Sequence, residues 1–436
     1  MSTALPALPA SLRDRATRPG DRDYRLLRST YTTPASPALV LRPRTEAEVA
    51  DALRYAADAD AALSVRSGGH GLSGRSSNDG GIVVDLSALA DIEVLDPGSG
   101  LTRIGPGARW AQVAAKLAPR GLAISSGDHG NVGVGGLATA GGVGWLTRAH
   151  GLTIDNVRAA HVVLPDGTIT RTDAEHDPDL FWAVRGAGDG VGVVTGFEIA
   201  AKPVGNIGIA QVAVEADRAG ATLRRWSEHM TEAPRELTAN AILFSEGGRS
   251  VLQMTAVAAT DDPDRVRALV EPLTRLGRPL GVEANLGPYT ALVPRGHLHP
   301  NVGQQPSHST NGLFPTLTAD SARAIMDVAN RPYGPLVQLR SMGGAVNDVD
   351  PEETAYSHRH QQVLAIFSAF PPAGPEELAA AVKEVRRYSD GAYRNFDSVP
   401  DRAAFRRAYP GAVGDRVLEL RRRYDPDGLL RRIDDV

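Results

Sequence analysis

The sequence predicts an α+β fold in two parts, and three observations lead to this prediction. Up to about residue 204, short apolar strands alternate with single helices and glycine-rich loops. From residue 205 the segments lengthen, and long strands alternate with amphipathic helices in two rounds. The segment that begins at Gly391 is mostly helical in character. The order of strands and helices in the second part is typical of an antiparallel sheet covered by helices on one face.

The first part opens with a strand and a capped helix. The segment PALVL at 37–41 is apolar and is expected to be a strand. A helix is predicted from 45 onward, because Thr45 and Glu48 have the spacing of a capping box. The other elements expected in this part are strands at 62–65, 81–86, 102–104 and 192–200, a helix over 108–118, a hairpin over 157–172 that turns at Pro165-Asp166-Gly167, and a helix with Pro178 in its first position.

The second part contains longer segments in two successive rounds. The first round comprises expected strands at 207–216, 237–244 and 250–259 and helices at 218–230 and 262–275. The second round comprises the segments 281–286, 319–330, 335–342, 361–369 and 375–388. The sequence has no repeat of solenoid length and no long linker.

The composition excludes several classes of protein. A net charge of −4 without a basic block argues against a nucleic-acid partner. The chain has no cysteine, which excludes disulfides, thiolate metal sites and cysteine nucleophiles. No segment approaches the roughly 18 consecutive apolar residues of a membrane span, and the N-terminal residues contain no apolar signal core. We therefore expect a soluble, cytoplasmic protein with no membrane partner, and the sequence leaves its oligomeric state open.

Glycine is the unusual feature of the composition. The chain has 46 glycines in 436 residues, about 10% against an average of roughly 7%. They concentrate in the segments 66–74 and 127–144. A turn at a strand end, as in SVRSGGHGLSG, can direct backbone N–H groups at an anion such as a diphosphate. A longer glycine loop can bring its backbone close to a flat ring system. His70 stands inside the first segment, where it is either a structural or a reactive histidine.

A second interpretation of the glycines is a Rossmann dinucleotide site. The residues from Gly133 to Ala138 fit the pattern G-x-G-x-x-A, and Asp155 follows at a suitable distance. However, no strand comes directly before the pattern, and the residues after it are too rich in glycine for a stable helix. We therefore expect no dependence on NAD(P).

A resemblance to a known family joins these segments. VRSGGHGLSG…NDGGIVVDLS resembles the FAD-binding loop of the vanillyl-alcohol-oxidase flavoproteins, whose FAD-binding domain is of the PCMH type. It is most similar to the berberine-bridge-enzyme-like branch and to the 6-hydroxy-D-nicotine-oxidase-like oxidases. The segments that agree in order and spacing are GDHGNVGVGGLATAGGVGWLTRAHGLTIDNV, DPDLFWAVRGAGDGVGVVTGFEI, GGAVNDVDPEETAYSHR, GAYRNF and RRRYDPDGLLR.

The resemblance implies both the domains and the cofactor. It implies a PCMH-type FAD-binding domain at 1–204, a substrate-binding domain at 205–389, and a C-terminal segment at 390–436 that returns to the FAD-binding domain. His70 would be bonded covalently to the 8α carbon of FAD. A second tether through cysteine is excluded, because His129 stands at the position of that cysteine. The other cofactor-binding residues implied are Arg66, Ser67, Gly68, Gly69, Gly71, Ser73, Gly127, Val132, Gly133, Gly135, Gly136, Gly141, Gly142, Val194 and Asn395.

The substrate side departs from the family pattern. His150 replaces a tyrosine of the family, and Gln338 stands where some members have a carboxylate base. Gln338 cannot remove a proton from a substrate, whereas Arg340 on the same strand face is suited to bind a carboxylate or an anionic flavin. The base is then either His150 or Tyr393, and for an amine substrate no strong base is required. If His150 is the base, His150→Ala is expected to slow flavin reduction by about 10²–10⁴-fold.

The activity implied is the oxidation of a small organic molecule. Hydride would leave a C–H next to oxygen or nitrogen for FAD, and O2 would be reduced to H2O2. Val134 stands at a position that controls oxygen access in the family, and a valine there favours oxidase behaviour. Two alternatives remain, an oxygenating or oxidatively cyclising flavoprotein and a flavin-binding protein without turnover. No metal site is expected, because surface loops account for His297, His299, His308, His358 and His360.

Overall fold

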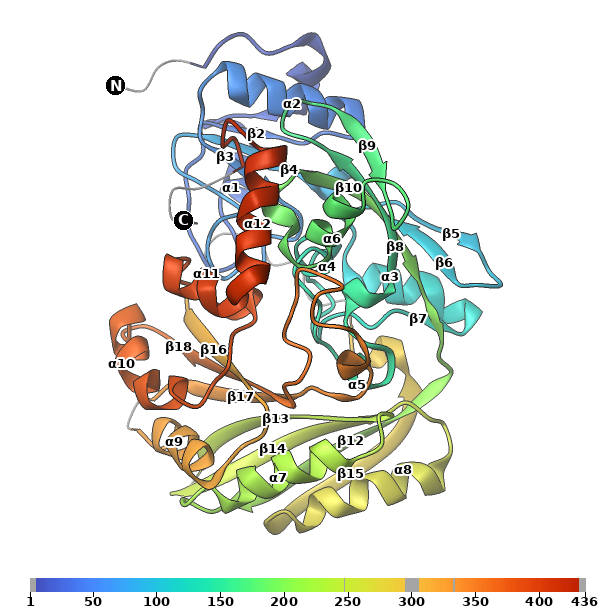
Figure 1. Cartoon of the computed structure of the whole chain (residues 1–436), viewed down its shortest axis with the longest axis vertical. Helices are drawn as coiled ribbons and strands as arrows, with labels where there is room; N and C mark the ends of the chain where they lie inside the picture. Colours follow the sequence, from blue (N-terminus) through green and yellow to red (C-terminus); the bar gives the residue numbers. More distant parts are fainter. Residues whose placement is uncertain (1–4, 247, 295–305, 332–333, 431–436) are drawn as a thin grey trace.

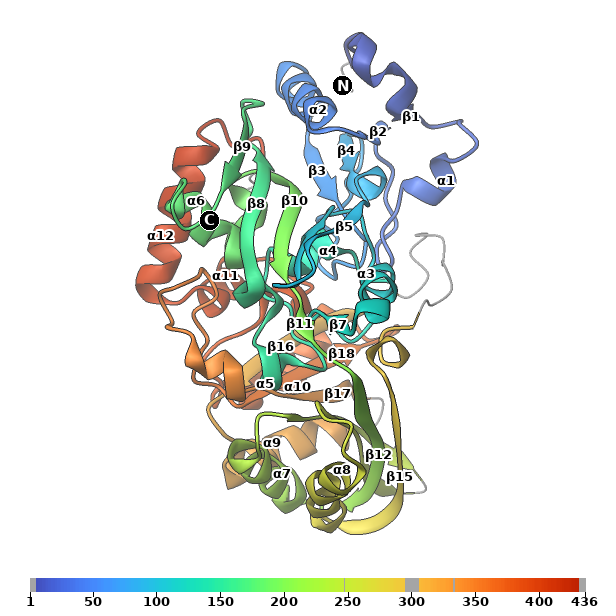
Figure 2. The same cartoon turned by 90° about the vertical axis from the view of Figure 1, so that its right-hand side faces the viewer.

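The structure is a computed structural model, and it describes residues 5–246, 248–294, 306–331 and 334–430. It contains a part with two small sheets and a part with one large sheet, and Figure 1 shows the small sheets above the large one. This arrangement of helices and sheets confirms the expected α+β class. The view at right angles in Figure 2 shows the N-terminal elements at the end of the molecule opposite to the large sheet.

The first small sheet is formed by the N-terminal residues. Its order is β1-β2-β4-β3, with β4 parallel to both β2 and β3. The strands are β1 (Ala16–Thr17), β2 (Leu39–Leu41), β3 (Leu63–Arg66) and β4 (Ile82–Asp85). Helix α2 (Glu46–Asp58) packs its apolar face on this sheet. The Thr45 side chain accepts a hydrogen bond from the Glu48 N–H at 3.1 Å, but the Glu48 carboxylate turns to the Arg44 N–H, so only half of the expected capping box is formed.

The second small sheet is antiparallel, with the order β5-β6-β10-β8-β9. The strands are β5 (Ile92–Asp96), β6 (Leu101–Ile104), β8 (Val157–Val163), β9 (Ile169–Thr172) and β10 (Val193–Ala200). The expected hairpin turn is confirmed, because Gly167 has a φ of +83° and donates to the Leu164 carbonyl at 2.8 Å. Short strands β7 (Leu122–Ala123) and β11 (Lys202–Pro203) pair beside this sheet.

Helices from both ends of the chain share the core of this second sheet. They are α3 (Trp110–Leu117), α6 (Pro178–Ala187), α11 (Arg402–Ala408) and α12 (Gly411–Tyr424). Val417 and Leu420 of α12 belong to the same buried cluster as Trp182 of α6. The C-terminal segment therefore lies against the part that precedes residue 205, as Figure 1 shows for α12 beside α6. The shorter helices of the protein are α1 (Tyr24–Leu27), α4 (Val134–Ala138) and α5 (Thr147–His150).

The large sheet is antiparallel throughout, with the order β15-β12-β14-β13-β17-β18-β16. Its strands are β12 (Asn206–Ala216), β13 (Leu237–Glu246), β14 (Arg249–Ala258), β15 (Arg278–Pro288), β16 (His308–Phe314), β17 (Leu336–Ser341) and β18 (Val363–Ala369). The first of them, β12, follows β11 after two residues, so the expected boundary at 204/205 lies between these strands.

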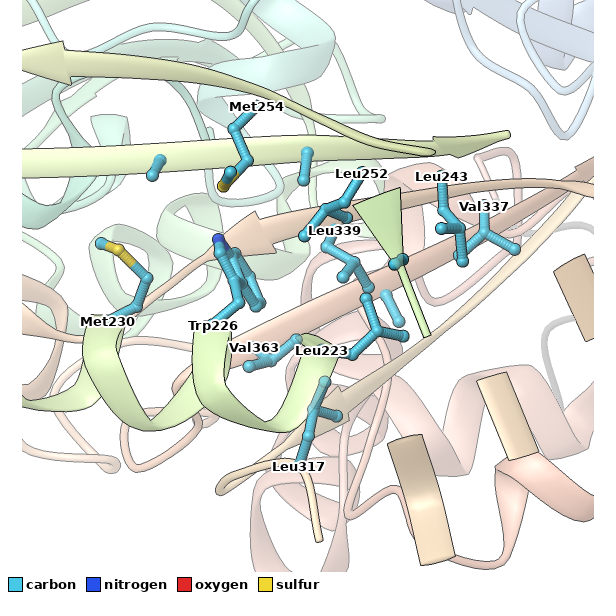
Figure 3. Packing of buried hydrophobic residues seen from close by; sticks show 14 of the residues in the cluster. Leu223, Trp226, Met230, Leu243, Leu252, Met254, Leu317, Val337, Leu339 and Val363 are labelled. Atoms are coloured by element: carbon cyan, nitrogen blue, oxygen red, sulfur yellow. The ribbon is translucent and has the colours of Figure 1, made fainter. Parts of the chain in front are cut away.

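Four helices cover one face of the large sheet. They are α7 (Ala221–Glu232), α8 (Pro263–Val270), α9 (Ala319–Ala329) and α10 (Pro375–Arg386), and all contribute to one buried cluster. Figure 3 shows Trp226 and Met230 of α7 directed at the strands that carry Met254 and Leu339. The opposite face of the sheet, with Leu364 and Ile366, packs on residues of the part that precedes residue 205 and on the C-terminal segment.

Five strands were not expected from the sequence: the two-residue strands β1, β7 and β11, and the longer strands β5 and β16. Strand β16 has the polar sequence HSTNGLF, yet its residues from 309 onward are buried. Its hydroxyl and amide groups are satisfied by neighbours, as for Ser309 with Ser368 and Asn311 with Tyr393. Strand β5 is an edge strand whose side chains are mostly exposed, so it lacks the apolar alternation that would have revealed it.

Buried arginines join the two parts. Arg148 of α5 donates to the carbonyls of Leu237 at 2.7 Å, Met342 at 2.5 Å and Ala233 at 2.8 Å. Burial lowers the pKa of Arg148 to about 10, so it remains charged at neutral pH. Three charge-assisted hydrogen bonds to the second part fix how the two parts meet. In the described part of the chain, no helix is long and apolar enough to cross a membrane.

Candidate functional site

A cavity of about 420 Å³ lies where the glycine-rich loops, β10 and the C-terminal segment meet. Residues from far apart in the sequence line it, including Tyr31, Asp128, Asp189 and Phe396. The lining residues that the sequence analysis predicted are Ser67, Gly68, Gly69, His70, Gly71, Gly127, His129, Val132, Gly133, Gly135, Gly136, Val194, Tyr393 and Asn395. The structure therefore brings most of the predicted cofactor-binding residues to one place.

The two glycine loops pack backbone against backbone. A Cβ on Gly68 would lie 2.3 Å from the Gly133 nitrogen, and a Cβ on Gly133 would lie 2.3 Å from the Gly68 nitrogen. Arg109 joins the loops, because its Nη1 donates to the Gly68 carbonyl at 2.6 Å and to the Asn131 carbonyl at 2.7 Å. Glycine is required at 68 and 133 for this close approach.

We expect Gly68→Ala to destabilise the protein by about 1–3 kcal/mol, because the added methyl group collides with backbone that cannot rotate away. The loops would separate, so FAD content should fall as well. Gly136→Ala is the matched control, since a Cβ there meets nothing within 4 Å. Thermal unfolding of both apoproteins gives the comparison. Equal midpoints for Gly68→Ala and wild type would contradict the close packing.

The backbone of residues 68–73 is arranged to bind an anion. In the described part of the chain, none of the N–H groups of these residues donates a hydrogen bond to another protein group. Gly69 has a φ of +69°, as expected where consecutive N–H groups turn toward one side. The diphosphate of a dinucleotide is an anion that can accept from such groups.

His70 lies at the wall of the cavity between two aromatic rings. Its ring stacks on Tyr31, with centroids 4.9 Å apart and planes 19° apart, and lies 5.6 Å from the ring of His129. Burial, with smaller contributions from the charges of Arg109 and His129, lowers the pKa of His70 to about 4. At neutral pH the imidazole is therefore uncharged, with a nitrogen lone pair available as a nucleophile.

Tyr393 and Asn395 of the C-terminal segment also line the cavity. The Tyr393 hydroxyl accepts hydrogen bonds from the Gly142 N–H at 3.0 Å and from Asn395 Nδ2 at 3.1 Å. A Cβ on Gly141 would lie 2.9 Å from the Tyr393 ring. Gly141 and Gly142 therefore contact Tyr393 and are not among the residues that line the cavity, and their expected contact with the cofactor stays a prediction.

Two other predicted cofactor residues also lie outside the lining. Arg66 is buried, its Nε donates to the Asp85 carboxylate at 2.6 Å, and its Nη1 donates to the Ser29 carbonyl at 3.3 Å. Its guanidinium therefore holds β3 to β4. Ser73 lines a smaller neighbouring pocket of about 80 Å³. Neither Arg66 nor Ser73 is among the residues that line the larger cavity.

The expected catalytic residues on the substrate side are not brought together. His150 ends helix α5 and is absent from the cavity lining, and burial followed by the charge of Lys202 lowers its pKa. Gln338 and Arg340 are also absent from the lining, and Arg340 Nη2 donates to Gln338 Oε1 at 2.8 Å. His150 is thus not among the residues that line this cavity, and the expected effect of His150→Ala on flavin reduction stays a prediction.

The sequence analysis missed two carboxylates in the lining. Asp128 forms an ion pair with Arg340. Asp189 forms ion pairs with Arg394, with Arg421 at 3.2 Å and with Arg75 at 4.0 Å. These arginine charges hold the pKa of Asp189 below its ordinary value even though burial raises it. Both aspartates stand within glycine-rich loops, and a charged residue in such a loop was the signal that could have revealed them.

Two further expectations concern the role of Val134 and possible metal ligands. Val134 is fully buried in the core of the second small sheet and is absent from the cavity lining, and its expected control of oxygen access stays a prediction. Among the described residues, the group of possible metal ligands is Asp173, Glu175 and His176, which lies outside the cavity lining. His297 and His299 lie outside the described residues.

The geometry excludes the Rossmann interpretation. Gly133 is preceded by a loop and not by a strand. A helix does begin after it, contrary to expectation, but α4 spans only Val134–Ala138. Both carboxylate oxygens of Asp155 accept from Arg359, at 2.8 and 3.0 Å, so Asp155 is not free to bind a ribose.

Comparison with known proteins agrees with this site. A family described as an FAD binding domain matches residues 37–173. (R)-6-hydroxynicotine oxidase of Paenarthrobacter nicotinovorans is 39% identical over 201 residues, which are 46% of this chain and 43% of that enzyme. Chitooligosaccharide oxidase of Gibberella zeae is 27% identical over 91% of this chain and 87% of its own length. The crystal structure of 6-hydroxy-D-nicotine oxidase from Arthrobacter nicotinovorans has a TM-score of 0.85 at 26% identity and covers 99% of both chains.

The fold, the loop geometry and these matches define an FAD-dependent oxidoreductase. The resemblance found in the sequence is confirmed. Residues 37–173 are an FAD binding domain, and the chain as a whole is similar to 6-hydroxynicotine and oligosaccharide oxidases of the PCMH-type, berberine-bridge-enzyme-like flavoproteins.

Proposed function

We propose that this protein is an oxidase that removes hydride from a C–H next to oxygen or nitrogen in a small organic molecule, with its FAD bonded covalently to His70. The observation that carries the proposal is the uncharged His70 in the lining of a cavity that two glycine loops enclose. Bound FAD supplies a hydride acceptor at N5 and passes the electrons to O2, which becomes H2O2.

The residues of the cavity support the binding of FAD in an extended form. The unpaired N–H groups of residues 68–73 would hold the diphosphate. Gly133, Gly135 and Gly136 leave room for a flat ring system close to the backbone. His70 would bond through a ring nitrogen to the 8α carbon, and Tyr31 stacked on its ring would fix the orientation of that nitrogen.

The Tyr393 hydroxyl serves to position its neighbours and does not act as a base. Burial raises the pKa of Tyr393 to about 12, so the hydroxyl keeps its proton throughout the neutral range. As an acceptor it fixes Asn395 Nδ2 and the Gly142 N–H at the edge of the cavity.

We therefore expect Tyr393→Phe to leave the pH dependence of flavin reduction unchanged between about pH 6 and 9. The variant should lose about 1–3 kcal/mol of stability, because the buried Gly142 N–H loses its acceptor. Flavin reduction rates measured anaerobically across this range give the test. A basic limb that is present in wild type and missing in Tyr393→Phe would show that Tyr393 is the base after all.

A substrate screen that measures peroxide tests the proposed reaction. Small alcohols, amines and oligosaccharides are mixed anaerobically with the protein, and bleaching of the flavin absorbance identifies a substrate. With O2 present, one H2O2 should then form for each substrate molecule oxidised. A substrate that reduces the flavin without peroxide formation would contradict the proposal and favour an oxygenating or dehydrogenating enzyme.

A further inference from the structure

Asp128 places a carboxylate in the cavity on the side of the large sheet. It stands between Gly127 and His129, which both line the same cavity. Its side chain is 27% exposed, whereas that of its partner Arg340 is 10% exposed. Arg340 is part of β17 and is absent from the lining. The lining of the cavity therefore includes Asp128 and does not include Arg340.

The ion pair leaves one oxygen of Asp128 available. Arg340 Nη2 donates to Oδ2 of Asp128 and also to Oε1 of Gln338. Among the described residues, no group donates a hydrogen bond to Oδ1 of Asp128. A carboxylate that is held by a guanidinium on one oxygen can accept a hydrogen bond from a ligand on the other.

Among the described lining residues, no other charged side chain competes with Asp128 for a ligand. The described lining residues include no lysine and no arginine. The other lining carboxylate, Asp189, already meets three arginines. The nearby Tyr289 hydroxyl is hydrogen-bonded to Ser126 at 2.9 Å. A ligand with a carboxylate or phosphate would find no cationic side chain here, whereas a cationic ligand would find Asp128.

We propose that Asp128 is a specificity-determining residue that recognises a cationic nitrogen, so that the substrates of this enzyme are small organic amines. The inference rests on the proposed function, because it names the substrate class of that same site. It concerns recognition only, in which Oδ1 of Asp128 accepts a hydrogen bond from a protonated nitrogen. A charged hydrogen bond of this kind is about twice as strong as a neutral one.

Three probes of the same shape test the preference for positive charge. Benzamidine, benzamide and benzoate are a cation, a neutral amide and an anion, and none has a C–H next to nitrogen that could be oxidised. We expect the holoenzyme to bind benzamidine at least about tenfold more tightly than benzamide, a difference of about 1.4 kcal/mol, and benzoate most weakly. Isothermal titration calorimetry measures the affinities, and perturbation of the flavin absorbance shows that the probe is in the cavity.

Variants of the protein test whether Asp128 causes the preference for benzamidine over benzamide. Asp128→Asn should reduce it to less than threefold. If that variant is unstable because Arg340 loses its partner, Asp128→Asn combined with Arg340→Met removes both charges and should also abolish the preference. Asp264→Asn, on the exposed surface of α8, is the control and should keep it.

Two outcomes would overturn the inference. One is a wild-type protein that binds benzamide or benzoate at least as well as benzamidine. The other is an Asp128→Asn protein that keeps the full preference for the cation. A change in flavin absorbance or FAD content without any loss of the preference would assign Asp128 to the cofactor instead. The probes need no turnover, so a failure of the proposed oxidase reaction would be seen separately, in the peroxide yield.

Discussion

FAD is expected in the supernatant after acid precipitation of His70→Ala, whereas in the wild-type protein it stays with the pellet. The imidazole of His70 lines the cavity and is uncharged, because its pKa is lowered to about 4. Alanine offers no nucleophile at this position, so the covalent fraction should fall from nearly all of the flavin to none. Absorbance of the pellet and supernatant at the flavin band measures both fractions.

The neighbouring His129 provides the matched control. Its ring also lines the cavity and lies 5.6 Å from that of His70. His129→Ala should keep the flavin attached. Release of flavin from the wild-type protein by acid, or attachment in His70→Ala, would show that His70 is not the tether.

Asp155→Asn is expected to lower the free energy of unfolding by about 3–5 kcal/mol, because it leaves a buried guanidinium without its counter-charge. The Arg359 side chain is fully buried and donates from both Nη atoms to the two carboxylate oxygens of Asp155. The pair joins the segment after α5 to the segment before β18, so it connects the two parts of the protein. Chemical denaturation followed by circular dichroism gives the change.

An exposed ion pair serves as the control, because removing one of its charges should change the free energy of unfolding much less. Arg387 and Glu384 pair at 3.0 Å on the surface of the protein. Glu384→Gln should cost less than about 1 kcal/mol. If Asp155→Asn costs no more than Glu384→Gln, the buried pair does not stabilise the junction of the two parts.

The sequence predicted most elements because local signals and the fold agree. The helix expected from residue 45 is α2, the hairpin turns at Gly167, and Pro178 opens α6. Strand β16 was missed because its polar side chains are satisfied only by partners far along the chain. Hydrophobic periodicity contains no information about such partners.

The glycine contacts of the site could be predicted from the sequence, whereas the directions of its longer side chains could not. The backbone contacts of Gly68 and Gly133 follow from residue type, because only glycine permits them. The roles of Arg66, His150 and Arg340 depend on where their side chains point, which neither spacing nor resemblance gives. Asp128 was missed because the Arg340 that holds it is far away in the sequence.

Reoxidation of the reduced protein by O2 tests the central claim, that this chain is a flavin oxidase, without knowledge of its substrate. The bound flavin is reduced anaerobically with dithionite, freed from excess reductant and mixed with air-saturated buffer in a stopped-flow instrument. We expect reoxidation that is much faster than that of free reduced FAD, with one H2O2 formed per flavin. Reoxidation no faster than that of free reduced FAD, or without stoichiometric H2O2, would contradict it.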